Sequence, residues 1–159
     1  MKNGNVILVA IDNSASAFKV TDYAIKIANA LHKSLYFIHV INESTPKIQR
    51  NQQDSVEGPT IQSLSEFYLK ECTKIAINND VDHAFHSIIY GVTKRKLVAM
   101  SNTKNVAFTI IGATGYDDLY HNRIGHIAQY VSSWSKSTVT IVRLSLIHIS
   151  EPTRLRCIA

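Results

Sequence analysis

The sequence predicts a Rossmann-like α/β fold in which helices cover both faces of a five-stranded parallel sheet. Compact apolar runs alternate along the chain with segments whose apolar residues are spaced by three and four. That alternation is typical of strands connected by helices. The first run, "NVILVAID", is nearly continuous in Val and Ile, as expected for a strand buried on both faces of a parallel sheet. With 159 residues, 45% of them hydrophobic, the chain is long enough to form one domain with its own core.

Five segments have the composition of strands. They are residues 5–12, 34–41, 81–91, 105–115 and 137–143. Parallel strands are joined by right-handed crossovers, so the intervening helices lie on both faces and the sheet is doubly wound. The chain shows neither internal repeats nor a second domain.

Two longer helices are expected in the first half of the chain. Asn13 or Ser14 is a candidate cap for the first helix, whose buried face is expected to hold Val20, Ala24, Ile27 and Leu31. Thr60 begins the second helix, which residues 78–80 end. Its expected buried face consists of Ile61, Leu64, Tyr68, Cys72 and Ile75.

Two further helices are expected in the second half. Gly91 closes the third strand, and Thr93 is a candidate cap for a short helix that runs to about Lys104. The last helix carries apolar residues at helical spacing, namely Ile124, Ile127, Val131 and Trp134.

Composition excludes several classes of protein. The formal charge of +5 comes from 17 Lys and Arg against 12 Asp and Glu, but the only dense basic run is Lys94–Lys96, which we interpret as a solvated helix face. We therefore expect no nucleic acid partner. No segment approaches the roughly 18 apolar residues of a membrane helix, so we expect no membrane partner and a cytoplasmic location. Cys72 and Cys157 fit neither a metal spacing nor a disulfide framework.

Two segments follow no strand or helix pattern. Residues 42–59 are polar and are expected to form a functional flap or a mobile insertion. Residues 1–143 are expected to form the domain, and residues 144–159 a C-terminal tail of non-native origin. If the tail is native, its apolar part could lengthen the last edge strand.

A candidate binding site follows from the topology. Ligands of doubly wound sheets bind at the carboxyl ends of the strands, where the strand order reverses. In a 3-2-1-4-5 order this point lies between the first and fourth strands. Asp12 ends the first of these strands and Gly112 ends the fourth, so the two residues would meet there.

Three parts of the sequence together resemble the universal stress protein family. They are "ILVAIDNSASA", "FIHVIN", and the Gly-x2-Gly-x9-Gly spacing before the last helix, and the similarity extends over residues 3–143. The resemblance implies a sheet of order 3-2-1-4-5, homodimers through the last strand and, in one branch, binding of ATP. It also implies a binding site made of Asp12, Val40, Ile111, Gly112, Gly115, Gly125 and His126.

Each residue of this implied site has a role in the nucleotide-binding members that it resembles. Asp12 would lie beside the adenosine, and the backbone of Val40 would face the adenine. The three glycines would form the loop for the ribose and phosphates. Glycines let the backbone approach oxygen atoms closely, and amides at a helix start attract an anion.

His126 departs from the family pattern, which has Ser or Thr after the third glycine. The imidazole could donate to a phosphate in place of the hydroxyl, or its bulk could occupy the phosphate space and leave the loop as a turn. Asp117 and Asp118 would repel a triphosphate unless they point outward or hold Mg²⁺, and Arg123 is the nearest cation in sequence.

Other candidate chemistry is weaker. His83 and His86 have odd spacing within a strand, which places them on opposite faces and disfavours a shared metal. His39 alternates with buried residues and is expected to be a sheet residue, and Ser14 lies in no nucleophile elbow. No P-loop is present. We expect no catalytic residues, and at most slow ATP hydrolysis.

Two functions from different classes remain. The first is a stress-response module that binds ATP at the carboxyl ends of the first and fourth strands. The second is a regulatory dimer that binds no nucleotide and acts through protein contacts.

Overall fold

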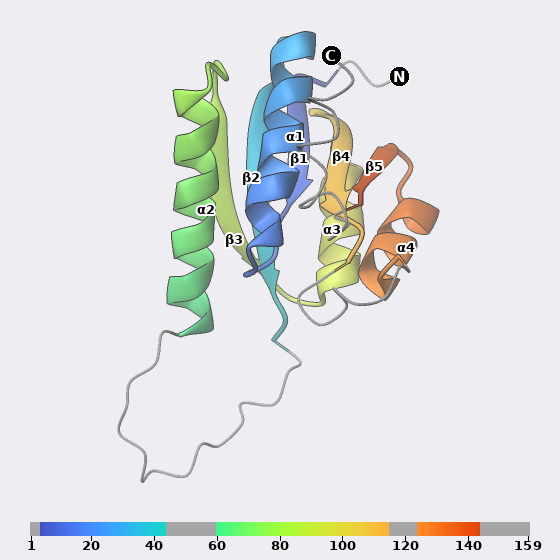
Figure 1. The fold of residues 1–159 in the computed structure, drawn as a ribbon. Helices are drawn as coiled ribbons and strands as arrows, with labels where there is room; N and C mark the ends of the chain where they lie inside the picture. Colours follow the sequence, from blue (N-terminus) through green and yellow to red (C-terminus); the bar gives the residue numbers. More distant parts are fainter. Residues whose placement is uncertain (1–3, 44–59, 115–123, 144–159) are drawn as a thin grey trace, which may run out of the picture.

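Nine elements alternate between strand and helix in a computed structural model (Figure 1), which describes residues 4–43, 60–114 and 124–143. The strands are β1 (Val6–Ala10), β2 (Ser34–Ile41), β3 (Ala84–Tyr90), β4 (Val106–Gly112) and β5 (Thr138–Val142). The helices are α1 (Ser16–Leu31), α2 (Ile61–Asn78), α3 (Thr93–Ser101) and α4 (His126–Trp134).

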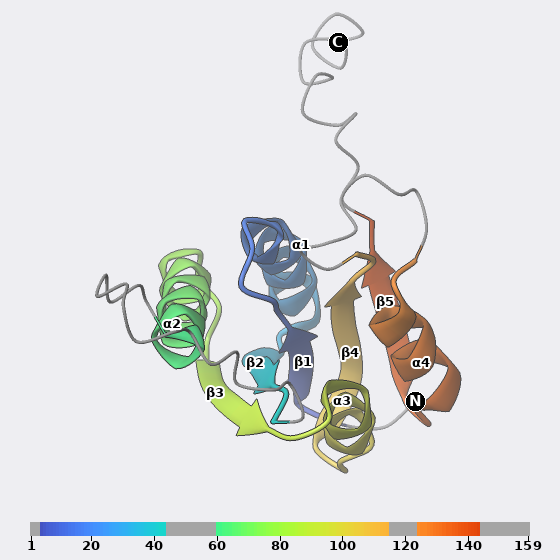
Figure 2. The same cartoon turned by 90° about the horizontal axis from the view of Figure 1, so that it is seen from below.

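The five strands form one sheet in the order β3-β2-β1-β4-β5, and every neighbouring pair is parallel. The predicted doubly wound α/β fold and its strand order are thus confirmed. Helices α1 and α2 lie on one face of the sheet, and α3 and α4 lie on the other (Figure 2). All strands run the same way, so their carboxyl ends meet at one edge.

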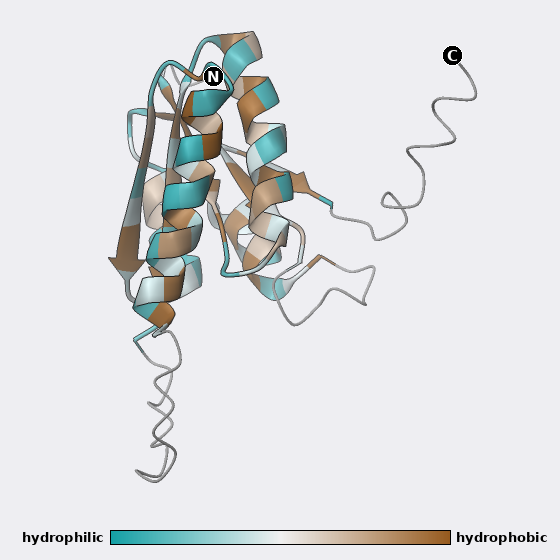
Figure 3. Cartoon of the chain, turned by 60° about the vertical axis from the view of Figure 1, so that its left-hand side comes forward, coloured by the Kyte–Doolittle hydropathy of each residue, from teal (hydrophilic) through white to brown (hydrophobic). Residues whose placement is uncertain are grey.

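Two apolar clusters hold the layers together. Phe37, Leu69 and Ile110 belong to the cluster between the sheet and α1 with α2. Leu8 and Val131 belong to the cluster under α3 and α4. In Figure 3 the strands are mostly hydrophobic, whereas α1 and α2 alternate hydrophobic and hydrophilic bands. Burial of a Phe or Leu side chain contributes about 1.5–3 kcal/mol.

Three residues expected on buried helix faces are exposed instead. Leu31, Ile61 and Trp134 expose 46%, 62% and 64% of their surfaces. Each is the first or last residue of its helix, where the sheet no longer covers it. The helical spacing of apolar residues predicts which face of a helix is buried, but it does not indicate at which residue the sheet stops covering that face.

The buried face of α2 is also rotated from the expected one. Its fully covered residues are Ser65, Leu69, Cys72 and Ala76, whereas Leu64, Tyr68 and Ile75 are only half-buried. Small Ser and Ala side chains can pack against the sheet, but a prediction based on the spacing of large apolar residues does not include them. The Ser65 hydroxyl is satisfied by the carbonyl of Ile61 at 2.7 Å.

The residues at the starts of α1, α2 and α3 differ from those that the sequence predicted. Thr60, the predicted start of α2, is its N-cap, because its hydroxyl accepts from the Ser63 amide at 3.1 Å and the helix begins at Ile61. The two caps that the sequence predicted are wrong. Ala15 is the N-cap of α1, because the Ser14 hydroxyl donates to Asp12 instead. Val92 is the N-cap of α3, so Thr93 is the first helical residue, and the helix ends at Ser101 rather than Lys104.

Strand β2 has the predicted bounds, whereas the other four strands are shorter than predicted. The third strand begins at Ala84 rather than Val81, because residues 81–83 form the entry from α2. Most of the polar insertion, residues 44–59, and the tail after Arg143 lie outside the described residues, and the interpretations of both segments stay predictions.

Candidate functional site

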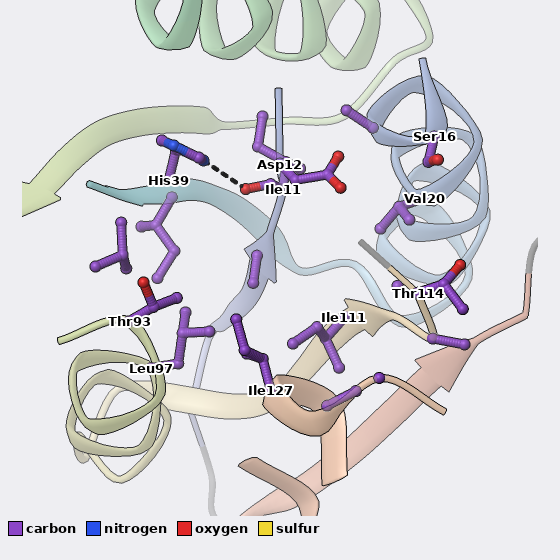
Figure 4. A pocket seen from close by; sticks show the side chains of 18 of the residues that line it. Ile11, Asp12, Ser16, Val20, His39, Thr93, Leu97, Ile111, Thr114 and Ile127 are labelled. Atoms are coloured by element: carbon purple, nitrogen blue, oxygen red, sulfur yellow. Dashed lines mark hydrogen bonds between the residues drawn. The ribbon is translucent and has the colours of Figure 1, made fainter. Parts of the chain in front are cut away.

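A cavity of about 370 Å³ opens at the edge where the carboxyl ends of the strands meet. It lies where the strand order reverses, between β1 and β4, with α1 on one side and α3 and α4 on the other (Figure 4). The cavity wall comprises Ala10, Ile11, Asp12, Ser16, Ala17, Val20, Ile38, His39, Val40, Thr93, Leu97, residues 111–114 and residues 125–128. Its size falls within the usual range of small-molecule sites.

Six of the seven residues expected at the site border this cavity. They are Asp12, Val40, Ile111, Gly112, Gly125 and His126. The seventh, Gly115, lies outside the described residues, as do Asp117, Asp118 and Arg123. Sheet topology therefore brings Asp12 of the first connection to the same cavity as Gly112 of the fourth strand.

Asp12 is held by its own loop. The Ser14 hydroxyl donates to Oδ1 of Asp12 at 2.5 Å, and Ser14 itself is 5% exposed. Next to it, the Asn13 side chain donates through Nδ2 to the Ser65 hydroxyl of α2 at 3.0 Å. These two bonds fix the turn from β1 to α1, so the carboxylate of Asp12 is positioned before any ligand arrives.

His39 also lines the cavity, although the sequence indicated only a sheet residue. Its Nδ1 lies 2.9 Å from the carbonyl oxygen of Ile11 (Figure 4). A carbonyl can only accept, so Nδ1 carries the proton in this contact. The histidine thus ties the end of β2 to the end of β1 beside Asp12.

Three helices begin at the cavity. Ser16, Thr93 and His126 are the first residues of α1, α3 and α4, and all three border the cavity. No side chain caps any of these helices, and none has an acidic residue in its first turn. In α1 the amides of Ala17 and Phe18 already donate to the carbonyls of Ser14 and Ala15. The positive ends of the three helix dipoles favour an anion in the cavity.

Two glycines bring backbone close to the cavity. A Cβ on Gly125 would lie 3.3 Å from the carbonyl oxygen of Ala113, and the Gly125 amide donates to that same oxygen at 2.6 Å. A Cβ on Gly112 would meet only Val20 at 3.5 Å and Thr114 at 3.7 Å. The glycine at 125 thus permits a close turn, whereas the one at 112 leaves space in the cavity.

His126 follows Gly125 directly and is exposed at the rim of the cavity. It belongs to the first turn of α4, whose amides are not bonded within the helix. The imidazole is not packed into the core, so it is free to turn toward the cavity or away from it.

Sequence reasoning missed part of the cavity wall. Thr93 and Leu97 contribute from α3, and Ser16 contributes from α1. A usable signal exists for two of them, since the first residue of a helix that follows a parallel strand lies at the carboxyl edge of the sheet. Leu97 carries no such signal, because its spacing marks it only as a core residue.

Within the described ranges, no group of three or more His, Cys, Asp or Glu side chains is placed to hold a metal ion. The ring of His86 bonds the Thr73 hydroxyl at 2.9 Å, whereas His83 stacks with Phe85 at 6.3 Å. None of the described helices is long and apolar enough to cross a membrane.

Comparison with known structures identifies the same fold in several proteins. A universal stress protein from Lactobacillus plantarum is 19% identical with a TM-score of 0.68, and the match covers 87% of this chain and 97% of that one. A universal stress protein in complex with cAMP is 19% identical with a TM-score of 0.65, covering 89% and 98%. A universal stress protein from Archaeoglobus fulgidus in complex with dAMP is 16% identical with a TM-score of 0.62, covering 89% and 98%.

At these identities the structures establish the fold alone. A search of curated proteins found no match. The family model of the universal stress protein family matches residues 5–143, which is most of the chain and all of its strands and helices. The chain therefore belongs to the universal stress protein family.

Proposed function

We propose that this protein binds an adenine nucleotide, with ATP as the principal ligand, in the cavity at the carboxyl ends of β1 and β4. One observation carries the proposal: the uncapped first turns of α1, α3 and α4 open onto a single cavity. Solved relatives of the same fold are complexes with cAMP and dAMP, which supports the same ligand class.

The phosphates bind at the start of α4 in this proposal. His126 and Ile127, in the first turn of α4, present backbone amides there, because the Gly125 amide already donates to Ala113. Gly112 borders the same cavity without a side chain. The first turn of a helix stabilises a nearby anion by about 0.3–1 kcal/mol, and by more where the site is partly buried. His126 replaces the family's hydroxyl as a donor to phosphate, because its exposed ring can reach the cavity rim.

The base and ribose bind toward β1 and β2. Ile38, Val40 and Leu97 supply apolar surface from β2 and α3. Oδ1 of Asp12 is engaged by Ser14, which leaves Oδ2 to accept from a ribose hydroxyl or the amino group of adenine. A mostly apolar cavity with few fixed polar groups is typical of sites for nucleosides and other small molecules.

Calorimetric titration of ATP with Mg²⁺ into the purified protein tests the proposal. We expect saturable binding that Asp12→Ala abolishes. Asp82→Ala is the matched control, because Asp82 is an exposed carboxylate that precedes β3 and does not border the cavity. Absence of both heat and a thermal shift at millimolar ATP would end the nucleotide proposal.

We further propose that the protein is a cytoplasmic homodimer that pairs through β5. This strand is one edge of the sheet, and its sequence "TVTIV" has no charge to block pairing. Sedimentation equilibrium is expected to give a dimer that Val139→Pro converts to a monomer, because proline removes a backbone donor on the free side of β5. The carbonyl of Val142 accepts from the Ala113 amide, so the backbone groups of residues 140 and 142 point toward β4 and those of Val139 point away from it. A wild-type monomer at micromolar concentration would contradict this assembly.

A further inference from the structure

The outer surface of α3 and α4 carries an exposed aromatic residue beside a group of cations. Trp134 ends α4 with 64% of its surface exposed, and it is the only tryptophan of the chain. Lys94, Arg95 and Lys96 are exposed on the first turns of α3. The two helices lie side by side on the same face of the sheet (Figure 2). We call Lys94, Arg95, Tyr130 and Trp134 the α3–α4 surface, because the side chain of Lys96 lies near Gly91, on the other side of α3.

The aromatic part of this surface is already organised. The rings of Tyr130 and Trp134 are 5.9 Å apart and inclined by 32°. Nζ of Lys94 lies 4.9 Å from the centre of the Tyr130 ring. Residues four apart share one side of a helix, so Trp134 lies on the side of α4 where Lys94 is found. Aromatic and cationic groups therefore meet on one patch.

Charge is unbalanced in the described residues from α3 to the end of β5. Residues 93–114 and 124–143 contain no Asp or Glu, whereas they contain Lys94, Arg95, Lys96, Lys104, Lys136 and Arg143. Helix α2 on the opposite face has both signs, with Glu66 and Glu71 beside Lys70 and Lys74. Three cations in the first turns of α3 are also placed against its dipole. An acidic partner would relieve both conditions.

We propose that the α3–α4 surface is a docking site for an acidic protein segment that inserts an aromatic or large aliphatic side chain beside Trp134. Carboxylates of the partner pair with Lys94 and Arg95. Trp, Tyr and Arg are the residue types that dominate binding energy in protein interfaces. Polar Ser133 is exposed on α4 between Tyr130 and the end of the helix, and it would belong to the rim of the interface.

The same features disfavour two other anionic partners. Nucleic acid would need several open ring faces for stacking. Here the half-buried Tyr130 already has Lys94 over its ring, which leaves one exposed tryptophan. A membrane surface would need a continuous apolar stripe. Trp134 is the only large apolar residue exposed among the described residues of α3 and α4.

Trp134 also makes the test direct, because all tryptophan emission comes from this surface. The probe is a short peptide in which a Phe-Leu pair is flanked on both sides by glutamates. We expect it to shift and saturate the emission at low salt, and to bind more weakly as salt rises. Matched peptides with lysines for glutamates, or Ser-Gly for Phe-Leu, are expected to bind at least about tenfold more weakly.

Variants locate the site, with affinity measured by anisotropy of the labelled acidic peptide. Lys94→Gln with Arg95→Gln is expected to lower affinity about fivefold, and Trp134→Ser about tenfold or more. Lys70 is exposed on α2, on the other face of the sheet, and Lys70→Gln is expected to leave the affinity for the peptide unchanged. All these side chains are exposed, so the variants keep the fold.

Several results would overturn the proposal. They are no binding of the acidic peptide, equal binding of the lysine peptide, and an equal effect of Lys70→Gln. Phosphatidylserine vesicles or oligothymidylate that shift Trp134 emission at lower concentrations than the peptide would assign the surface to a membrane or to nucleic acid, and would equally refute it.

Discussion

A methyl group added at position 112 is expected to affect ligand affinity and fold stability in different ways. Gly112 ends β4 and borders the cavity, and its φ lies outside the left-handed region. A Cβ there would meet Val20 at 3.5 Å and Thr114 at 3.7 Å, which are ordinary contact distances. Gly112→Ala is therefore compatible with the free protein, but it places a methyl in space that the proposed nucleotide uses.

The two effects differ in sign. Replacing an unstrained Gly by Ala reduces the entropy of the unfolded chain and stabilises the fold by about 0.4–1 kcal/mol. Within the complex, the added carbon stands about 1.5 Å nearer to any ligand atom that packs against the Gly112 backbone. Such overpacking costs about 1–3 kcal/mol. ATP affinity should then fall by about five- to a hundredfold, while the thermal midpoint without ligand is unchanged or rises by about 2 °C.

Calorimetry with ATP and Mg²⁺ measures the first effect, and thermal unfolding without ligand measures the second. Gly4→Ala is the opposite control, since its Cβ would overlap the backbone of Asn105 and Ala107, before the start of β1. We expect Gly4→Ala to lower the thermal midpoint and to leave affinity unchanged in the folded protein. Wild-type ATP affinity of Gly112→Ala would refute the placement of the ligand against β4.

Three further predictions concern single side chains. Asp12→Asn should weaken ATP and adenosine alike, because the Asp12 side chain is assigned to the nucleoside end; isothermal titration would detect a selective loss of ATP, which would contradict that assignment. His126→Ala should weaken ATP about tenfold and adenosine little, and His126→Ser should restore part of the loss; tighter binding by His126→Ser would instead show that the imidazole obstructs the site. Burial raises the pKa of Cys72 from 9.0 to about 11, so the native thiol stays protonated while the unfolded one ionises first. Cys72 therefore contributes stability that is complete below pH 9 and is lost between about pH 9 and 11, by about 2–3 kcal/mol. Denaturation across this pH range should show this loss of stability in the wild type and not in Cys72→Ala. Both proteins would carry Cys157→Ser, so that they differ only in the thiol at position 72.

Sequence periodicity predicted the elements well and their ends poorly. The bounds of β2 agree with the prediction, and the helix start predicted at Thr60 lies one residue before Ile61, with Thr60 as the cap. Ser14 and Thr93 carry the same capping chemistry, yet neither caps its helix. A hydroxyl can cap only where no stronger partner is in reach, and at Ser14 the Asp12 carboxylate is that partner.

Topology also predicted that Asp12 and Gly112 would lie together, because strand ends of a parallel sheet converge wherever the order reverses. Asp12 and Gly112 meet at one cavity for that reason. The other candidate site residues were expected only from the resemblance to the family. The sequence did not predict that His39 would line the cavity. Its spacing from Leu35 and Phe37 indicates a strand residue, but not that this residue lies near the carboxyl end of the sheet.

The alternation of apolar runs and helical spacing by itself determined the fold class, because the fold class depends on which faces are apolar and on chain direction. Tertiary structure alone decided which ends of helices are covered, as the exposed Leu31 and Trp134 demonstrate. It also decided that three uncapped helix starts share one cavity, and that Lys94 lies over Tyr130 of another helix. Those features depend on distances between segments far apart in the chain, which local patterns do not contain.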